Sequence, residues 1–356
     1  MIKERISSIL IVFVLLAAFL ARIPLMSQAG KDYVTFQQSV NDLAFGINPY
    51  KDTLRSFQDK DITSGGYAYF PGLLYTFFSL YLVSIISYIP VEILWKIPNL
   101  LAEFGVAFLL IKSLRPKGIG TTLVALVIWL FNPYFVLDQR YTYTDAIPVF
   151  FMIASMFYLG KDDVVAGALF ALAVIFKPFP LFAFPLFLLL SSKKLNFIVS
   201  GVLVGLLFSI PFLRSFEDFM TYVRGALFVH EGRSVTGRPF LFYISYFYKI
   251  EFIQLIPIKI YTTLATFLGW VLIIAMYFFK RIKNPYILAT AALVSFYAFS
   301  PVLNRTYLLW FIPFFLISLA SFKKHVFFYT IAILFYAFYS WYLWQWIDGF
   351  HITRPW

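Results

Sequence analysis

The sequence contains no cysteine. This absence excludes disulfide bonds, thiol catalysis and cysteine-ligated zinc sites. Histidine occurs only three times, and His230, His325 and His351 are too scattered along the chain to form a histidine-based metal site. Charged residues are scarce as well, at 13% of the chain, whereas soluble globular proteins average about 25%. These shortages exclude a soluble enzyme, a disordered chain and a nucleic-acid-binding domain.

Hydrophobic residues are abundant, at 61% of the 356 residues, and the mean hydropathy is +0.82. This composition requires a polytopic membrane protein. One membrane-spanning helix needs about 20 apolar residues, so the chain has room for about eleven spans and modest loops. We therefore expect an all-α, polytopic membrane helical bundle.

The apolar runs locate the expected spans. We predict them at residues 6–26, 94–112, 119–137, 145–160, 164–177, 181–191, 197–213, 257–279, 285–302, 307–320 and 326–346. The first run is interpreted as a span and not as a cleaved signal peptide. Residues 1–356 form one transmembrane domain in this interpretation, with no soluble domain.

A further apolar run at residues 70–89 is ambiguous, and charge resolves it. Cytoplasmic loops carry an excess of lysine and arginine. With eleven spans every basic loop cluster lies on the cytoplasmic side, and a crossing at 70–89 would turn all of them outward. The clusters are Lys112/Arg115/Lys117, Lys193/Lys194, Lys280/Arg281/Lys283 and Lys323/Lys324. We therefore predict that residues 70–89 lie along or dip into the outer leaflet without crossing.

The polar residues then concentrate outside the membrane. Two outer segments, 27–93 and 214–256, are large, and we expect them to form an active-site face, with juxtamembrane helices in the first. The formal net charge of +12 is interpreted first as an orientation signal. The expected localisation is the cell membrane, with the active site on the outer face.

One acidic residue is placed to do chemistry at that face. Asp32 follows the first span by a few residues and so should lie close to the membrane surface. A carboxylate at that depth, under an aromatic lid, is a candidate general base. The alternative is an exposed loop aspartate.

Two other acidic positions are candidates. Asp138 and Asp145 flank one outer turn, where they would orient an acceptor or bind a divalent metal together with Asp32. No strict DxD pattern is present, and we expect no metal and no other cofactor. Glu103 lies within the span at 94–112, where a carboxylate is a functional candidate by default, although we favour a structural residue that either pairs with a buried polar group or stays protonated.

Several short motifs follow one another in a recognisable order. Asp32-Tyr33 comes soon after the first span, followed by Gly-Ile-Asn-Pro-Tyr at 46–50 and Tyr69-Phe-Pro. Asn-Pro at 132–133 closes the third span, and Asp145-Ala-Ile-Pro, Phe-Lys-Pro-Phe-Pro at 176–180 and Tyr307-Leu-Leu-Trp with Pro313 come later. This ordered set resembles GT-C superfamily glycosyltransferases, and above all the multispan mannosyltransferases that use a polyprenyl-phosphate sugar.

The chain departs from the family pattern at two places. Thr142 and Tyr143 stand where many relatives have Gly-Gln before the aspartate, and Asn304 stands where many carry a histidine. A role that depends on a histidine side chain is therefore not expected at that second position.

The resemblance implies a reaction. A hexose, with mannose the commonest in the similar enzymes, would pass from a polyprenyl-phosphate donor to an acceptor hydroxyl with inversion. Asp32 would be the general base. Tyr33, Tyr69, Asp145, Asn304, Tyr307, His230 and Glu231 are the residues expected to contact the sugar or the acceptor. Since no soluble outer domain is evident, we expect a lipid or glycolipid acceptor, with membrane lipids as the other partners and no nucleic acid.

The leaving phosphate needs cations. The predicted topology places Lys177, Arg305, Arg140 and Arg238 at outer span ends, where an anionic lipid phosphate is a natural counter-ion. The alternative is ordinary snorkelling to the headgroups.

Two other classes of protein remain as alternatives to a glycosyltransferase. A secondary transporter or lipid flippase for a glycolipid would show duplicated halves and polar, broken helices at mid-membrane, and neither is clear here. A structural partner in an assembly would not need cations at these outer positions.

Overall fold

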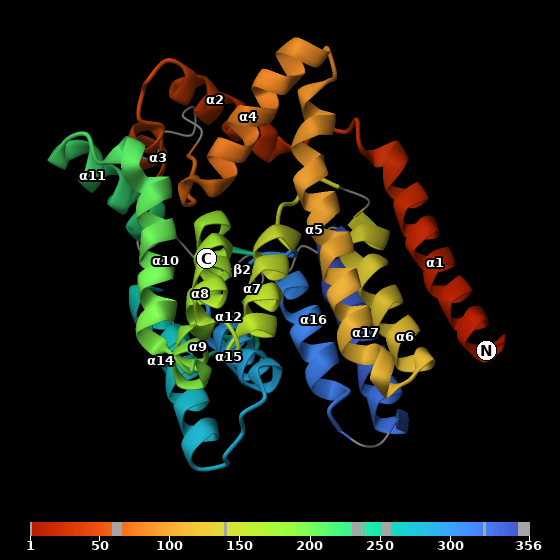
Figure 1. Cartoon of the computed structure of the whole chain (residues 1–356). Helices are drawn as coiled ribbons and strands as arrows, with labels where there is room; N and C mark the ends of the chain where they lie inside the picture. Colours follow the sequence, from red (N-terminus) through yellow and green to blue (C-terminus); the bar gives the residue numbers. More distant parts are fainter. Residues whose placement is uncertain are drawn as a thin grey trace.

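The computed structural model describes residues 2–58, 66–138, 141–229, 236–237, 239–250, 258–322 and 325–347. Within them the chain forms a bundle of α-helices, which confirms the expected all-α class (Figure 1). The helices of the bundle are α1 (Ile2–Arg22), α5 (Val91–Leu114), α6 (Ile119–Leu130), α7 (Ala146–Tyr158), α8 (Asp163–Phe176), α9 (Phe184–Leu190), α10 (Lys194–Ser209), α14 (Ile258–Phe278), α15 (Pro285–Phe299), α16 (Leu308–Leu319) and α17 (His325–Ile347).

A smaller group of helices gathers at one end of this bundle (Figure 1). It comprises α2 (Lys31–Ala44), α3 (Tyr50–Gln58), α4 (Pro71–Ser87) and α11 (Phe216–Val223). These are the juxtamembrane helices expected in the first outer segment, joined by one from the second. A further helix, α12 (Phe240–Phe247), and two two-residue strands, β1 (Thr236–Gly237) and β2 (Val302–Leu303), complete the regular elements, and the strands pair in parallel.

Short helical turns join these elements. Those used below are η1 (Ile23–Leu25), η3 (Tyr134–Asp138), η4 (Phe179–Ala183) and η6 (Arg224–Phe228).

Four of the described helices are long and apolar enough to cross a membrane: Arg5–Leu25, Val91–Lys117, Lys194–Phe212 and His325–Trp344. Shorter apolar helices occupy the other expected span positions. A helix of 12 residues, such as α6, rises about 18 Å, which is less than the ~30 Å hydrocarbon core. Because of the four long apolar helices, the protein is an integral membrane protein. Because several of the other helices are short, the count of eleven spans stays a prediction.

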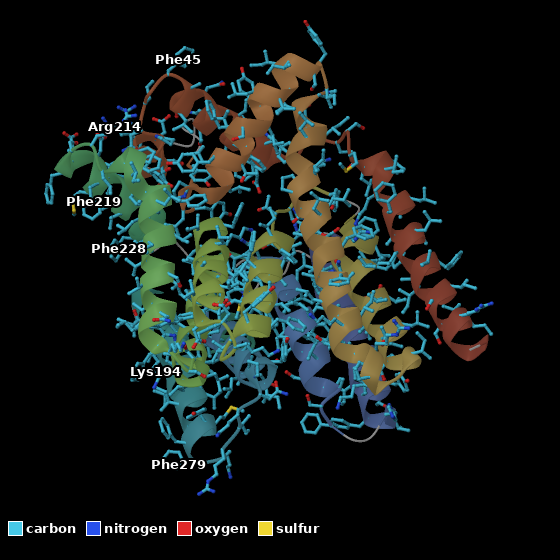
Figure 2. All side chains as sticks on the ribbon, in the orientation of Figure 1. Phe45, Lys194, Arg214, Phe219, Phe228 and Phe279 are labelled. Atoms are coloured by element: carbon cyan, nitrogen blue, oxygen red, sulfur yellow. The ribbon has the colours of Figure 1, made fainter. Side chains whose placement is uncertain are left out.

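Several of the basic loop clusters lie at one end of the bundle, as the sequence predicts. The start of α1 and the turn between α5 and α6, which carries Arg115 and Lys117, lie at one end (Figure 1). Lys194 and Phe279, which precedes Lys280, lie at that same end, and Arg214 lies at the opposite one (Figure 2). This arrangement agrees with a single cytoplasmic end, and Lys323 and Lys324 fall outside the described residues.

Helix α4 occupies the ambiguous apolar run. It is confined to the end that holds α2 and α3, and α5 then runs back through the bundle (Figure 1). Pro71 starts the helix, and Tyr88 ends it in the left-handed conformation. This arrangement is compatible with a segment that does not cross, which stays a prediction.

A buried ion pair ties the first helix to the bundle. Most of α1 is exposed, yet Arg22 at its end is 1% exposed and its Nε lies 2.6 Å from Glu103 Oε2. Glu103 also accepts hydrogen bonds from the hydroxyls of Tyr141 and Tyr143. The mid-span carboxylate is therefore paired, as the structural interpretation of the sequence expects.

Candidate functional site

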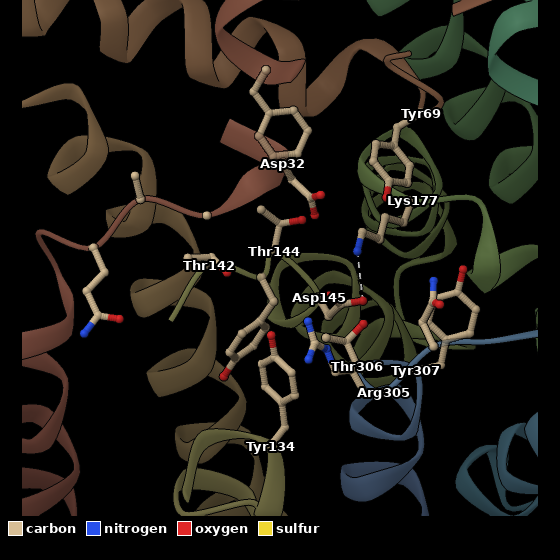
Figure 3. A pocket seen from close by; sticks show the side chains of 16 residues that line it. Asp32, Tyr69, Tyr134, Thr142, Thr144, Asp145, Lys177, Arg305, Thr306 and Tyr307 are labelled. Atoms are coloured by element: carbon tan, nitrogen blue, oxygen red, sulfur yellow. Dashed lines mark hydrogen bonds and ion pairs between the residues drawn. The ribbon is translucent and has the colours of Figure 1, made fainter. Parts of the chain in front are cut away.

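A cavity of about 580 Å³ lies where the end helices meet the bundle, and Figure 3 shows the side chains around it. It is lined by residues that are far apart in the sequence: 28–30, Asp32, Phe36, Tyr69, Tyr134, 142–145, Lys177 and 304–307. The fold thus brings together many of the predicted site residues, namely Asp32, Tyr69, Asp145, Lys177, Asn304, Arg305 and Tyr307.

Asp32 enters the cavity from the first turn of α2. An acidic residue there is stabilised by the positive end of the helix dipole. The carboxylate is exposed, and among the described residues it has no hydrogen-bond or ion-pair partner. Gly30, which caps the helix, lies against Thr142 so closely that an added Cβ would stand 2.7 Å from the threonine Cβ. Glycine therefore lets the segment of Asp32 touch the segment of Asp145.

Asp145 is held very differently, because its side chain is buried and one of its carboxylate oxygens binds two donors. Its Oδ1 accepts from Lys177 Nζ at 2.9 Å and from Trp310 Nε1 at 2.6 Å. The Trp310 ring stacks between Phe179 and Tyr307, with centroids 4.2 and 4.1 Å apart. Of the two carboxylates in the cavity, Asp145 is therefore neutralised and fixed.

Lys177 caps the C-terminal end of α8 and is 8% exposed. Besides Asp145, its ammonium faces the Tyr69 ring at 5.3 Å. The hydroxyl of Tyr50, in the Asn-Pro-Tyr motif, donates to the backbone carbonyl of Tyr69 at 2.7 Å. That motif thus positions the aromatic wall beside the lysine.

Arg305 lies in a tight turn between β2 and α16, with Asn304 before it and Tyr307 after it. The backbone of the turn is fixed from outside, since Tyr339 donates to the Arg305 carbonyl at 2.8 Å and Tyr297 donates to the Tyr307 carbonyl at 2.7 Å. Arg305 itself is half-buried and lines the cavity (Figure 3). A second cation is thereby held near Lys177.

An apolar groove of about 340 Å³ adjoins this cavity. The two share Tyr69, Lys177 and Tyr307, so the lysine stands where polar and apolar spaces meet. The rest of the groove is formed mainly by apolar and aromatic side chains of η4, η6, α14, α15 and α16, which include Phe179, Phe182, Leu227, Trp270, Phe296 and Trp310.

Other expected residues lie elsewhere. Tyr33 does not line the cavity, because its ring is buried against Phe36 and Trp95. Burial raises the pKa of Tyr33 well above its usual value, and the nearby acidic groups of Glu92 and Asp32 act in the same direction. Four expected site residues, Arg140, Arg238, His230 and Glu231, lie outside the described residues.

The described residues of the second outer segment, 214–229, 236–237 and 239–250, lie mostly away from the cavity, and the part that carries His230, Glu231 and Arg238 is outside the described residues. None of its described residues lines the polar cavity, and Leu227 reaches only the groove. The polar side of the cavity comes from the first outer segment, from turns at 142–145 and 304–307, and from Tyr134 and Lys177.

Sequence reasoning missed part of the wall. Gln28, Tyr134, Thr142, Thr144 and Thr306 line the cavity without having been predicted there. Trp310 was noticed only as part of a motif, and the described residues show it binding Asp145. The sequence signal that could have pointed to Trp310 is its place in the same motif as Tyr307, which was predicted as a site residue.

A metal site formed by three carboxylates finds no support here. The described residues contain no group of three or more histidine, cysteine, aspartate or glutamate side chains that could hold a metal ion. The side chain of Asp138 is outside the described set. What the described cavity offers is one exposed carboxylate, one neutralised carboxylate and two cations.

The comparisons with known proteins give one match. The model of glycosyltransferase family 87 matches residues 67–303, well over half of the chain. The matched range includes Tyr69, Asp145 and Lys177 and ends just before Asn304, while Asp32 precedes it. No curated protein and no solved structure matches the sequence significantly.

Proposed function

Since the chain belongs to glycosyltransferase family 87 and is a membrane glycosyltransferase, we propose that it transfers a hexose from a polyprenyl-phosphate donor to a lipid or glycolipid acceptor. Mannose is the first sugar to test. One observation carries the proposal: a polar cavity with a free carboxylate and two cations opens onto an apolar groove.

The junction between the polar cavity and the apolar groove supports a lipid-phosphate sugar as the donor. A lipid-phosphate sugar has an apolar tail, a charged phosphate and a polar ring in that order. The groove, Lys177 and the cavity offer the same order of surroundings. An ammonium group has three N–H bonds and Asp145 uses one of them, so the same lysine has donors left for a phosphate oxygen. Arg305 would contact a second oxygen.

The difference between Asp32 and Asp145 supports Asp32 as the general base. The acceptor hydroxyl attacks the anomeric carbon, its proton passes to Asp32, and the bond to the phosphate oxygen breaks to release polyprenyl phosphate. Asp145 is a poor base because Lys177 and Trp310 already hold its oxygen. A direct displacement of this kind inverts the anomeric configuration and needs only one base, unlike the two-carboxylate glycosidases.

The proposed face is the outer one, because the basic loops gather at the opposite end of the bundle. An acceptor anchored in the same membrane would reach the cavity at that level. We therefore propose that the active site faces the outside of the cell membrane.

The function is tested with purified protein in vesicles and a panel of labelled donors. We expect sugar transfer from at least one polyprenyl-phosphate hexose to a lipid acceptor, and none from the matching nucleotide sugar. Transfer from the nucleotide sugar alone would contradict the proposed donor. Movement of the intact lipid-linked sugar across the membrane, with no transfer product, would favour the transporter interpretation.

Replacing Lys177 tests the phosphate contact. Lys177→Met alone leaves the buried Asp145 without its cation, so the informative variant is Lys177→Met with Asp145→Asn. A hydrogen bond to a charged group contributes about 1.5–3 kcal/mol, so the donor KM or Kd should rise by roughly 10- to 150-fold. Asp145→Asn alone is the control, and donor binding as tight in the double variant as in that control would contradict the role of Lys177.

Filling the groove tests the lipid tail. We expect Leu227→Trp to raise the KM of a long-chain donor by roughly tenfold, because overpacking a site costs about 1–3 kcal/mol. A donor with a tail too short to reach the groove should be unaffected. The matched control is Leu203→Trp on the exposed surface of α10. An equal effect on long and short donors would place the tail elsewhere.

A further inference from the structure

Helix α5 presents three polar residues to the interior on one face. Lys96, Asn99 and Glu103 are spaced three and four positions apart, which places them in line along a helix. Their exposed fractions are 2%, 1% and 1%. None of them lines the polar cavity, so their cost of burial is not explained by contact with a substrate there.

Lys96 holds the segment that leads to Asp32. Its ammonium donates to the backbone carbonyls of Leu25 and Gln28, in the link between α1 and α2. Gln28 already lines the cavity, and Asp32 follows it by four residues. The lysine therefore fixes the backbone from which the exposed carboxylate projects.

Asn99 and Glu103 hold the segment that carries Asp145. Asn99 Oδ1 accepts from the backbone N–H of Ala146 at 3.2 Å, directly after the aspartate. Glu103 accepts from the hydroxyls of Tyr141 and Tyr143, just before it. These hydrogen bonds hold the turn on both sides of Asp145.

The two segments are also joined to each other. Glu103 binds Arg22 at the end of α1 as well as the two tyrosines, so one carboxylate spans both segments. Further along, Gly30 of one segment lies directly against Thr142 of the other. One face of α5 thus contacts both segments that carry the cavity carboxylates.

We propose that Lys96, Asn99 and Glu103 are positioning residues for sugar transfer, acting through Asp32 and Asp145 without touching substrate. The inference rests on the proposed function, in which Asp32 is the general base. Misplacing a catalytic group by about 1 Å costs on the order of 100-fold in rate, so loss of one anchor should lower kcat and leave donor binding nearly unchanged.

The first test uses Lys96→Met in the full-length protein. We expect kcat to fall by about 10- to 100-fold with the donor KM within about twofold of the parent value. Lys112→Met is the matched control, because Lys112 lies on the same helix but is exposed near its far end. Its kcat should be unchanged. A raised KM at unchanged kcat, or no effect of Lys96→Met, would overturn the proposal.

A double-mutant cycle separates positioning from general damage. If Lys96 acts through Asp32, Lys96→Met should have little further effect in an Asp32→Asn background, since effects of residues that act as a unit are not additive. A full multiplicative loss in the double variant would show a merely structural role. Unchanged transfer by Asp32→Asn alone would instead refute the proposed function, so the two failures are distinguishable.

Discussion

Asp32→Asn is expected to lower kcat for sugar transfer by about a thousandfold, within the 10²–10⁴ range for loss of a general base. Asparagine has nearly the same shape as aspartate but does not accept the hydroxyl proton. Because Asp32 is exposed and has no partner among the described residues, its replacement should leave the fold intact. Donor binding should change little, since the phosphate is held by other groups.

The measurement is single-turnover transfer from a labelled polyprenyl-phosphate sugar, with thermal unfolding of the same preparation alongside. Asp42→Asn is the matched control, because Asp42 lies on the same helix but outside the cavity. Unchanged kcat in Asp32→Asn would exclude this carboxylate as the base. Equal losses in both variants would point to damage of α2 instead.

Glu103→Leu should produce the largest loss of stability. It leaves the Arg22 guanidinium buried without its carboxylate, and the hydroxyls of Tyr141 and Tyr143 lose their acceptor. Breaking a buried ion pair by removing one partner costs about 3–5 kcal/mol. We expect the free energy of unfolding to fall by that amount, measured by reversible denaturation in detergent.

The double variant Arg22→Met with Glu103→Leu provides the sharper comparison. Replacing both members of a buried pair with apolar residues is often neutral, so much of the lost stability should return. Transfer activity should not return with it, because the turn that carries Asp145 still lacks its anchor. Glu217→Leu, at an exposed position, is the control for the substitution itself. Full recovery of activity in the double variant would count against positioning by Glu103.

Composition and the apolar runs predicted the fold class and the positions of the helices well. Burial in a membrane is set by long apolar runs, so residues 94–112 become α5 and residues 285–302 become α15 with little change of boundary. The charge pattern also predicted which helix ends lie together. Charge parity predicted that residues 70–89 do not cross the membrane, since hydrophobicity alone does not distinguish them from a span, and the place of α4 at one end of the bundle is compatible with that prediction (Figure 1).

The site was predicted only in part, because several of its contacts join residues that are far apart in the sequence. Asp32 stood out by its position just after the first span, and Lys177 and Arg305 stood out because a cation at a span end needs an anionic partner. The bond from Trp310 to Asp145 joins positions 165 residues apart, and no local pattern reports it. The groove depends on how several helices pack, and the burial of Tyr33 depends on α5, so neither was readable from spacing.

The wall of Tyr69, Lys177 and Tyr307, shared by cavity and groove, has a kinetic consequence under the proposed function. A donor seated there keeps its carrier chain in the groove during the reaction, and the spent carrier departs sideways along the path by which the next donor arrives. The donor and the released polyprenyl phosphate then compete for the same groove. The proposed function therefore predicts product inhibition by the carrier lipid that depends on its density in the membrane.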